Sequence, residues 1–155
     1  MLAQKLNREL GIPWVPEYGR LYAEAHGTDF AMADLLAMAE GQDAAMREAS
    51  AGAPPLLLLD TDPLMTAAWA RMLFGQVPDA LLGYEKAELY LLFEPDVHWV
   101  ADGTRLFGTM EERKRFAATA EAMLVRAQVR YERVSGSWAK REMIVRKLIG
   151  LPDRA

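Results

Sequence analysis

The 155-residue sequence contains no cysteine and no long apolar run. The missing cysteine excludes a disulfide framework and a thiolate metal site, and it suits a reducing compartment. No stretch approaches the ~18 consecutive apolar residues that a membrane-spanning helix requires. The N-terminus lacks the basic-then-apolar order of a signal peptide, because Lys5, Arg8 and Glu9 interrupt it at helical spacing. We therefore expect a cytoplasmic protein with no membrane partner.

The sequence also lacks an excess of positive charge. Its formal net charge is −4, whereas nucleic-acid-binding domains usually carry a basic face, so we expect no nucleic-acid partner. Basic residues do gather toward the end of the chain, and we interpret them as a solvated helix face: Arg126, Arg130, Arg133, Lys140, Arg141, Arg146 and Lys147. The two histidines, His26 and His98, have no metal-binding spacing to any carboxylate, so we expect neither to hold a metal.

What is present is an ordinary globular composition, 52% hydrophobic and 26% charged. The length fits one domain, and we expect a single domain over residues 1–155. Hydrophobic periodicity predicts helices over residues 2–10, about 28–50, 63–73, about 78–86, 111–128 and 137–149. Strands are predicted over residues 12–15, 56–60, 89–93 and 129–134. Strands alternate with helices throughout, which predicts an α/β fold with a parallel sheet.

Open parallel sheets bind ligands beyond the carboxyl ends of their strands, so the candidate functional residues are expected at those ends. Asp60 follows the run Leu56–Leu59, which reads as a strand buried on both faces. An aspartate there can hold Mg²⁺ through water beside a nucleotide, or it can cap the next helix. Asp62 falls on the same side as Asp60 if the backbone stays extended. The two carboxylates would then converge, although one of them can serve only as the cap for a helix at Pro63.

A second strand end carries Glu17 and Arg20. A carboxylate at Glu17 can accept a hydroxyl proton or hold a sugar hydroxyl. Arg20 can neutralise a phosphate, or it can form an internal ion pair with Glu17, which the residues alone slightly favour.

The segment after the third strand, residues 94–108, predicts a mobile lid with Gly103 and Gly108 as hinges. Arg105 on this loop and Arg113 beyond it suit the neutralisation of phosphate oxygens, and solvent exposure is their alternative role. Aromatic side chains can form a stacking slot for a flat cationic ring or can belong to the core. The aromatic candidates are Trp14, Tyr18, Trp69, Phe74 and Trp99.

These segments, in this order, resemble the ribosylnicotinamide kinase family, which comprises the NadR-type kinase domain and stand-alone relatives classed as AAA ATPases. The resemblance runs from residue 2 to about residue 150. The matching stretches are residues 17–20, 60–62 with Thr66 and Trp69, 74–75, 89–92, 95–96, 99–105, Gly108, Arg113 and 134–136. Their joint spacing is far more specific than any single stretch.

The resemblance implies a P-loop kinase-like three-layer sandwich and transfer of the ATP γ-phosphate to the 5′-hydroxyl of nicotinamide riboside in NAD salvage. ATP and Mg²⁺ would be the cofactors, and a homo-oligomer is compatible with it. By resemblance, Asp60 would organise Mg²⁺, Glu17 or Asp62 would hold or deprotonate the riboside hydroxyls, and Arg105 and Arg113 would act as lid cations.

The resemblance also implies the binding residues. Gly136 and Ser137 would lie near adenine. The residues on the side of the nucleoside substrate would be Trp14, Tyr18, Arg20, Trp69, Phe74, Trp99 and Asp102. One small departure from the family is Ala101, where a second acidic residue is frequent.

A large departure is the missing P-loop, because no G-x-x-x-x-G-K-[ST] occurs in the 155 residues. The family's first strand lies centrally, between the strands at 56–60 and 89–93, and we expect it to precede Met1 in the natural gene product. Without it, this chain should bind ATP poorly and be marginally stable. The alternative is a non-catalytic nucleotide- or phosphate-binding relative that has lost the P-loop. A third interpretation is a kinase for another nucleoside or sugar.

Overall fold

The computed structural model describes residues 2–97 and 108–152. The chain divides into two compact units, residues 1–85 and 86–155, and each is described by itself. Trp99, Asp102 and Arg105, which the sequence placed in the lid and substrate site, lie outside the described residues, as do His98 and Gly103. No helix in the described ranges is long and apolar enough to cross a membrane.

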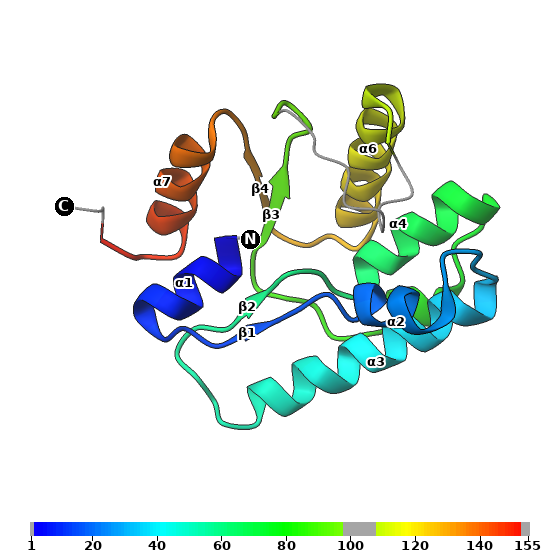
Figure 1. Cartoon of the computed structure of the whole chain (residues 1–155), viewed down its shortest axis with the longest axis horizontal. Coiled ribbons are helices and arrows are strands. Elements are labelled where there is room, and N and C mark those ends of the chain that lie inside the picture. Colours follow the sequence, from blue (N-terminus) through cyan, green and yellow to red (C-terminus); the bar gives the residue numbers. More distant parts are fainter. Residues whose placement is uncertain (1, 98–107, 153–155) are drawn as a thin grey trace. The chain divides into compact units, whose positions relative to one another are not determined.

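The first unit contains one short parallel strand pair with helices around it (Figure 1). Its elements are α1 (Leu2–Leu10), β1 (Trp14–Val15), α2 (Tyr18–His26), α3 (Met32–Ser50), β2 (Leu58–Leu59), α4 (Pro63–Phe74) and α5 (Asp79–Leu82). In the strand pair, Trp14 lies opposite Leu58 and Val15 opposite Leu59. The long helix α3 packs on β1, α2 and α4. Fully buried alanines on α3 and α4, among them Ala39 and Ala67, let helices approach closely.

The second unit holds a parallel pair of longer strands. Its elements are β3 (Tyr90–Phe93), α6 (Met110–Arg126), β4 (Tyr131–Val134) and α7 (Trp138–Leu148). Tyr90 lies opposite Tyr131 and Phe93 opposite Val134. Helix α6 packs on β3 and α7 on β4, and in Figure 1 the two helices flank the strand pair.

Local signals in the sequence explain most helix ends. Gly11 takes a left-handed conformation with a φ of 68° and ends α1 at residue 10, the end of the predicted range. The Asp62 carboxylate accepts a hydrogen bond from the Met65 N–H at 3.1 Å and caps α4. Thr109 and Glu112 form a reciprocal capping box at the start of α6. Helix positions therefore follow the predicted ranges closely where caps are present.

Three local predictions were wrong. Helix α2 was not predicted at all. Helix α3 begins at Met32 rather than at about residue 28, because the Asp34 carboxylate accepts the Ala31 N–H at 2.7 Å and so stabilises the later start. Strand β2 has only two residues, and both are half-buried rather than buried on both faces.

The parallel arrangement predicted from the sequence is confirmed in both units. Within the described residues, β2 pairs with β1 and β3 pairs with β4, and the two hydrogen-bonded ladders share no strand.

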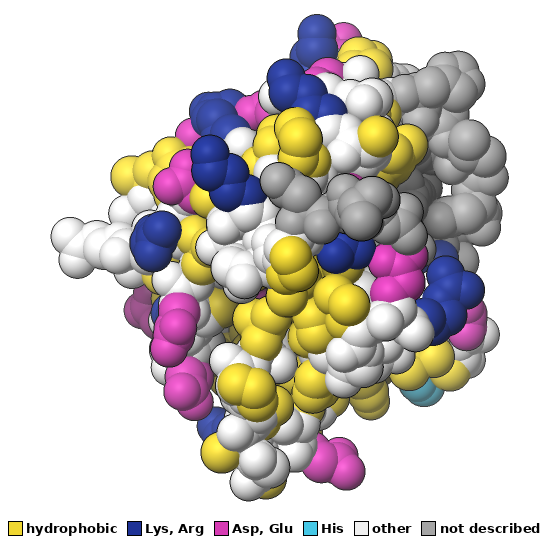
Figure 2. Space-filling model, turned by 90° about the vertical axis from the view of Figure 1, so that its left-hand side faces the viewer, with side chains coloured by type: hydrophobic (Ala, Val, Ile, Leu, Met, Phe, Trp, Pro, Cys, Tyr) yellow, Lys and Arg dark blue, Asp and Glu magenta, His cyan; other side chains and the backbone are white. Residues whose placement is uncertain are grey.

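Some large hydrophobic side chains remain on the surface, and Figure 2 shows apolar side chains exposed on one face between charged ones. The greatest exposed fraction among these large hydrophobic residues is 62%, at Trp138. Scattered exposed apolar residues are normal on proteins, so this surface alone assigns no site.

Candidate active site

The carboxyl edge of the β1–β2 pair brings two predicted site residues together. The Asp60 N–H donates to the Val15 carbonyl at 3.0 Å, so Asp60 directly continues the ladder of β2. Glu17 lies two residues beyond Val15, at the end of β1. Because the strands are parallel, both carboxylate-bearing positions lie at the same edge. Asp60 is exposed there and Glu17 is half-buried.

Asp62 occupies a different environment from Asp60. It is only 2% exposed, and its side chain caps α4 through the Met65 N–H. Its backbone is extended, with a φ of −151°. The sequence left open whether one carboxylate serves as the helix cap, and the structure assigns that task to Asp62. The exposed carboxylate of this pair is Asp60.

The residues on either side of Glu17 are hydrogen-bonded to a residue that the sequence analysis missed, Gln42 of α3. The Gln42 side-chain oxygen accepts the Tyr18 N–H at 2.8 Å, and its nitrogen donates to the Pro16 carbonyl at 3.3 Å. A signal for Gln42 was available. It is a polar residue that continues the helical spacing of the apolar side chains Leu35 and Met38, where burial demands hydrogen bonds.

The predicted aromatic slot draws its described members from three elements of the first unit. Trp14 is in β1, Tyr18 begins α2, and Trp69 and Phe74 belong to α4. The first three are half-buried and Phe74 is 36% exposed. Arg20 lies in α2, one turn from Glu17, and is half-buried. These positions are compatible with a pocket wall, and their binding roles stay predictions.

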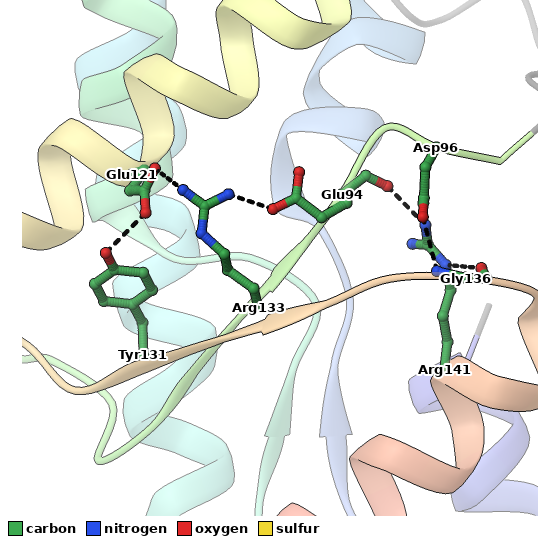
Figure 3. Close-up of polar contacts among 7 residues, drawn as sticks. All are labelled: Glu94, Asp96, Glu121, Tyr131, Arg133, Gly136 and Arg141. Atoms are coloured by element: carbon green, nitrogen blue, oxygen red, sulfur yellow. Dashed lines mark hydrogen bonds and ion pairs between the residues drawn. The ribbon is translucent and has the colours of Figure 1, made fainter.

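In the second unit, a buried arginine joins the loops that follow β3 and β4 (Figure 3). Arg141 is 1% exposed. Its guanidinium donates to the carbonyls of Gly136 and Glu94, both at 2.7 Å, and to the Asp96 carboxylate. The second oxygen of Asp96 accepts the Gly136 N–H at 2.7 Å. Gly136 has a φ of 93°, which favours glycine at this turn.

Charge and aromatic contacts complete this network. The Gly136 N–H, followed by the Arg141 guanidinium, holds the pKa of Asp96 below its ordinary value. The Arg141 guanidinium also lies 5.6 Å from the ring centre of Phe93 and 5.4 Å from that of Trp138. The Gly136 backbone is therefore held on both its N–H and its carbonyl. Ser137, also predicted near adenine, caps α7 by accepting the Lys140 N–H at 3.3 Å.

A neighbouring ion network ties β4 to α6. Arg133 donates to the carboxylates of Glu94 and Glu121, and the Tyr131 hydroxyl donates to Glu121 at 2.8 Å. The hydrogen bond to Glu121 raises the pKa of the Tyr131 hydroxyl. Together with the Arg141 network it forms the line of polar contacts drawn in Figure 3.

These contacts correct the interpretation of the C-terminal basic residues as a solvated helix face for two of the seven residues; the other five are exposed, as expected. Arg141 and Arg146 are buried, at 1% and 5% exposure. Arg146 pairs with Glu142, one helical turn earlier, at 3.0 Å. Composition could not show this, because burial of an arginine depends on acceptors elsewhere in the chain, such as Asp96 for Arg141.

An open hollow lies beside the network, at the carboxyl end of β3. Its volume is about 520 Å³ and it is lined by Glu94, Pro95, Asp96, Met110 and Lys114. Arg113, the predicted lid cation, lies in the same helix as Met110 and donates to the Val97 carbonyl at 3.5 Å. Lys114 thus supplies positive charge to the hollow, and the role of Arg113 toward phosphate stays a prediction.

The described residues contain no group of three or more histidines, cysteines or acids that could hold a metal. Mg²⁺ beside a nucleotide needs only one or two carboxylates, since phosphates and water supply the remaining ligands. Asp60, exposed at a strand end, fits that requirement. Asp62, buried and engaged as a cap, does not.

The fold is that of an α/β protein of the P-loop kinase-like type, with parallel strand pairs, helices between them and acidic residues at the carboxyl edge of the first pair. A solved structure described as NadR protein in complex with NR has the same fold, with a TM-score of 0.72 over 99% of this chain and 48% of that one, at 21% identity. The family described as AAA domain matches residues 1–141. The chain belongs to this AAA domain family.

Two curated relatives support the same family assignment. The trifunctional NAD biosynthesis/regulator protein NadR of Escherichia coli (strain K12) is 31% identical over 125 residues, which is 76% of this chain. The protein of the same name from Salmonella typhimurium (strain LT2) is 30% identical over 129 residues. This chain spans about 30% of the length of either relative. The NadR-like resemblance predicted from the motifs is thereby confirmed.

Proposed function

We propose that this chain belongs to an ATP-dependent kinase that phosphorylates the 5′-hydroxyl of nicotinamide riboside in NAD biosynthesis. The observation that carries the proposal is the shared carboxyl edge of β1 and β2, where Glu17 follows one strand and Asp60 the other. Support comes from the solved structure described as NadR protein with NR and from the NadR relatives. The cytoplasmic location expected from the sequence belongs to the same proposal.

In this proposal the residues of the first unit have separate tasks. Glu17 accepts a hydrogen bond from, or the proton of, the riboside hydroxyl. Asp60 holds the hydration shell of Mg²⁺, which when bound offsets charge on the phosphates. Asp62 keeps α4 in place as its cap. The half-buried aromatic residues Trp14 and Tyr18 would line the nicotinamide ring.

The second unit would serve the nucleotide. The fixed backbone at Gly136 and the cap residue Ser137 form the turn on which adenine would rest. Arg105 and Arg113 would cover the transferring phosphoryl group, because cations act most strongly on charge that develops in the transition state. Arg105 lies outside the described residues, so its task rests on the family resemblance alone.

The missing G-x-x-x-x-G-K-[ST] motif favours a second candidate, a non-catalytic relative that binds a nucleotide or phosphate. That motif supplies the backbone amides and the lysine that hold the β- and γ-phosphates. An active enzyme would need these groups in addition to those of the 155 residues.

Phosphate transfer from ATP to nicotinamide riboside tests the proposal. The assay compares the 155-residue chain with the protein expressed from its complete coding sequence, and it includes other nucleosides as acceptors. Formation of the mononucleotide by the complete protein is the expected result. Nucleotide binding without transfer to any acceptor would favour the second candidate, and transfer to another nucleoside would change the substrate.

A further inference from the structure

Gln42 is a buried polar side chain for which the proposed chemistry has no task. It lies in the middle of α3 and is 2% exposed. Both polar atoms of its side chain are engaged, the oxygen by the Tyr18 N–H at 2.8 Å and the nitrogen by the Pro16 carbonyl at 3.3 Å. A fully buried amide is costly unless both ends find partners, and here both partners come from one short turn.

The two partners flank Glu17 on either side. The Pro16 carbonyl belongs to the peptide group before Glu17, and the Tyr18 N–H belongs to the peptide group after it. Rotation of either peptide group is what changes φ and ψ of Glu17, which are −68° and 108°. The Gln42 side chain therefore holds both φ and ψ of Glu17. These two angles set the direction of the Glu17 Cα–Cβ bond.

The residue before Gln42 strengthens this arrangement. A Cβ on Gly41 would overlap the ring of Tyr18, so the ring packs directly on the α3 backbone at that point. Glycine inside a helix costs up to about 1 kcal/mol relative to alanine, and the space it leaves is filled by Tyr18. Gly41 and Gln42 together hold the side chain of Tyr18 and the backbone on both sides of Glu17.

We infer that Gln42 is a positioning residue, which sets the direction of the Glu17 carboxylate toward the acceptor hydroxyl. This inference rests on the proposed function, because it gives Glu17 a substrate to meet. A catalytic carboxylate misplaced by about 1 Å can cost roughly 10²-fold in rate. Gln42 would therefore affect the acceptor reaction without touching the substrate.

Three variants of the protein, expressed with its complete coding sequence, test the inference. Gln42→Met keeps the length of the side chain and removes both hydrogen bonds. Gln42→Glu keeps the acceptor, and it regains the donor only when the introduced carboxyl is protonated. Asp43→Asn is the matched control, because Asp43 is the next residue on α3, is 6% exposed, and bonds to Arg47 rather than to the turn.

We expect Gln42→Met to lower kcat/KM for nicotinamide riboside by about 10- to 100-fold and to leave KM for ATP unchanged. Asp43→Asn should keep kcat/KM for the riboside within about threefold of wild type. For Gln42→Glu, kcat/KM is compared with that of wild type at each pH. The difference between the two should shrink as the pH falls, because the introduced buried carboxyl then takes up a proton and becomes a donor. In hydrogen exchange, Gln42→Met should accelerate the Tyr18 amide and Asp43→Asn should not.

The outcomes separate the inference from the proposed function. A wild-type protein that phosphorylates no nucleoside overturns both. If wild type is active and Gln42→Met matches Asp43→Asn in kcat/KM and in Tyr18 exchange, only the inference is overturned. If Gln42→Met impairs kcat/KM for the riboside and KM for ATP to the same extent, the inference is also overturned, since that pattern indicates a general loss of structure.

Discussion

The Asp96 carboxylate and the Arg141 guanidinium bind each other across 45 positions of sequence, and Asp96 also accepts the Gly136 N–H. One charged pair therefore joins the segment after β3 to the turn between β4 and α7. Several consequences of this pair and of the first unit's acidic edge can be measured.

Removing the buried guanidinium should destabilise the protein. Arg141→Met removes the guanidinium donor of the Asp96 carboxylate and of the Glu94 and Gly136 carbonyls. We expect the free energy of unfolding in urea to fall by about 1–3 kcal/mol, since Asp96 is 41% exposed and regains water. Lys147→Met, an exposed change on the same helix, is the control and should stay within about 0.5 kcal/mol. Equal urea midpoints for the two variants would contradict the prediction.

The same pair predicts a pH dependence. The Asp96 pKa is lowered in the folded state, so its stabilising effect is complete above the ordinary value of 3.8 and is lost as the pH falls through the lower, folded value. The difference in urea midpoint between wild type and Asp96→Asn should be constant near neutral pH and shrink below about pH 4. Asp34 and Glu112, whose pKa values are also lowered, titrate in both proteins and cancel. A difference that persists unchanged to pH 2 would show that the charge of Asp96 is not responsible.

The acidic edge of the first unit predicts losses of turnover. In an active protein with its complete coding sequence, Glu17→Gln and Asp60→Asn should each reduce kcat by roughly 10²–10⁴-fold, the usual effect of losing a general base or a metal-organising carboxylate. The exposed Glu48→Gln on α3 serves as the control. Wild-type kcat in either site variant would remove that residue from the mechanism.

Asp62 should behave as a helix cap and not as a catalytic acid. Asp62→Ala removes the acceptor of the Met65 N–H and should cost about 0.5–2 kcal/mol of stability. Asp62→Ser retains a capping oxygen and should recover most of that loss. If Asp62 acts only as a cap, kcat of Asp62→Ser will also stay near that of wild type. A stable Asp62→Ser protein with turnover reduced as strongly as in Glu17→Gln would instead support a catalytic carboxylate.

Gly41→Ala should have the opposite effect on stability from a usual glycine-to-alanine change in a helix. Such a change normally stabilises by up to about 1 kcal/mol, but here the added methyl group overlaps the Tyr18 ring. We expect Gly41→Ala to destabilise the protein by about 1–3 kcal/mol. In a Tyr18→Ala background the same change should be neutral or stabilising, and thermal unfolding of the four proteins measures the coupling. Additive effects of the two changes would argue against the contact.

The sequence predicted the helix ends that are determined by residues adjacent to them in the chain. Gly11 ends α1, and the Asp62-Pro63 pair starts α4, because their signals lie within one helical turn. Helix α2 was not predicted, because its N-cap residue Glu17 makes no side-chain cap hydrogen bond that would mark the start of the helix.

Part of the candidate site was predictable for a similar reason. Glu17 and Asp60 were selected because each follows a strand, and parallel pairing then brings those ends to one edge. Gln42 and Arg141 were missed because their partners are distant in sequence. Gln42 bonds to the turn at Pro16, and Arg141 bonds to Asp96. Only the fold decides which distant acceptor a buried amide or guanidinium meets.

The two separate ladders also bear on how the chain acquires its structure. Trp14 pairs with Leu58 and Tyr90 with Tyr131, so each ladder closes a loop of about forty residues. Such closure is slow relative to helix formation, and the helices within each loop, α2 and α3 in one and α6 in the other, should be in place first. In a pulse-labelling refolding experiment, amides of α3 and α6 should gain protection before those of Leu58 and Asp60, which donate to the first ladder. The acidic edge that carries Glu17 and Asp60 would then be among the last features of its unit to form.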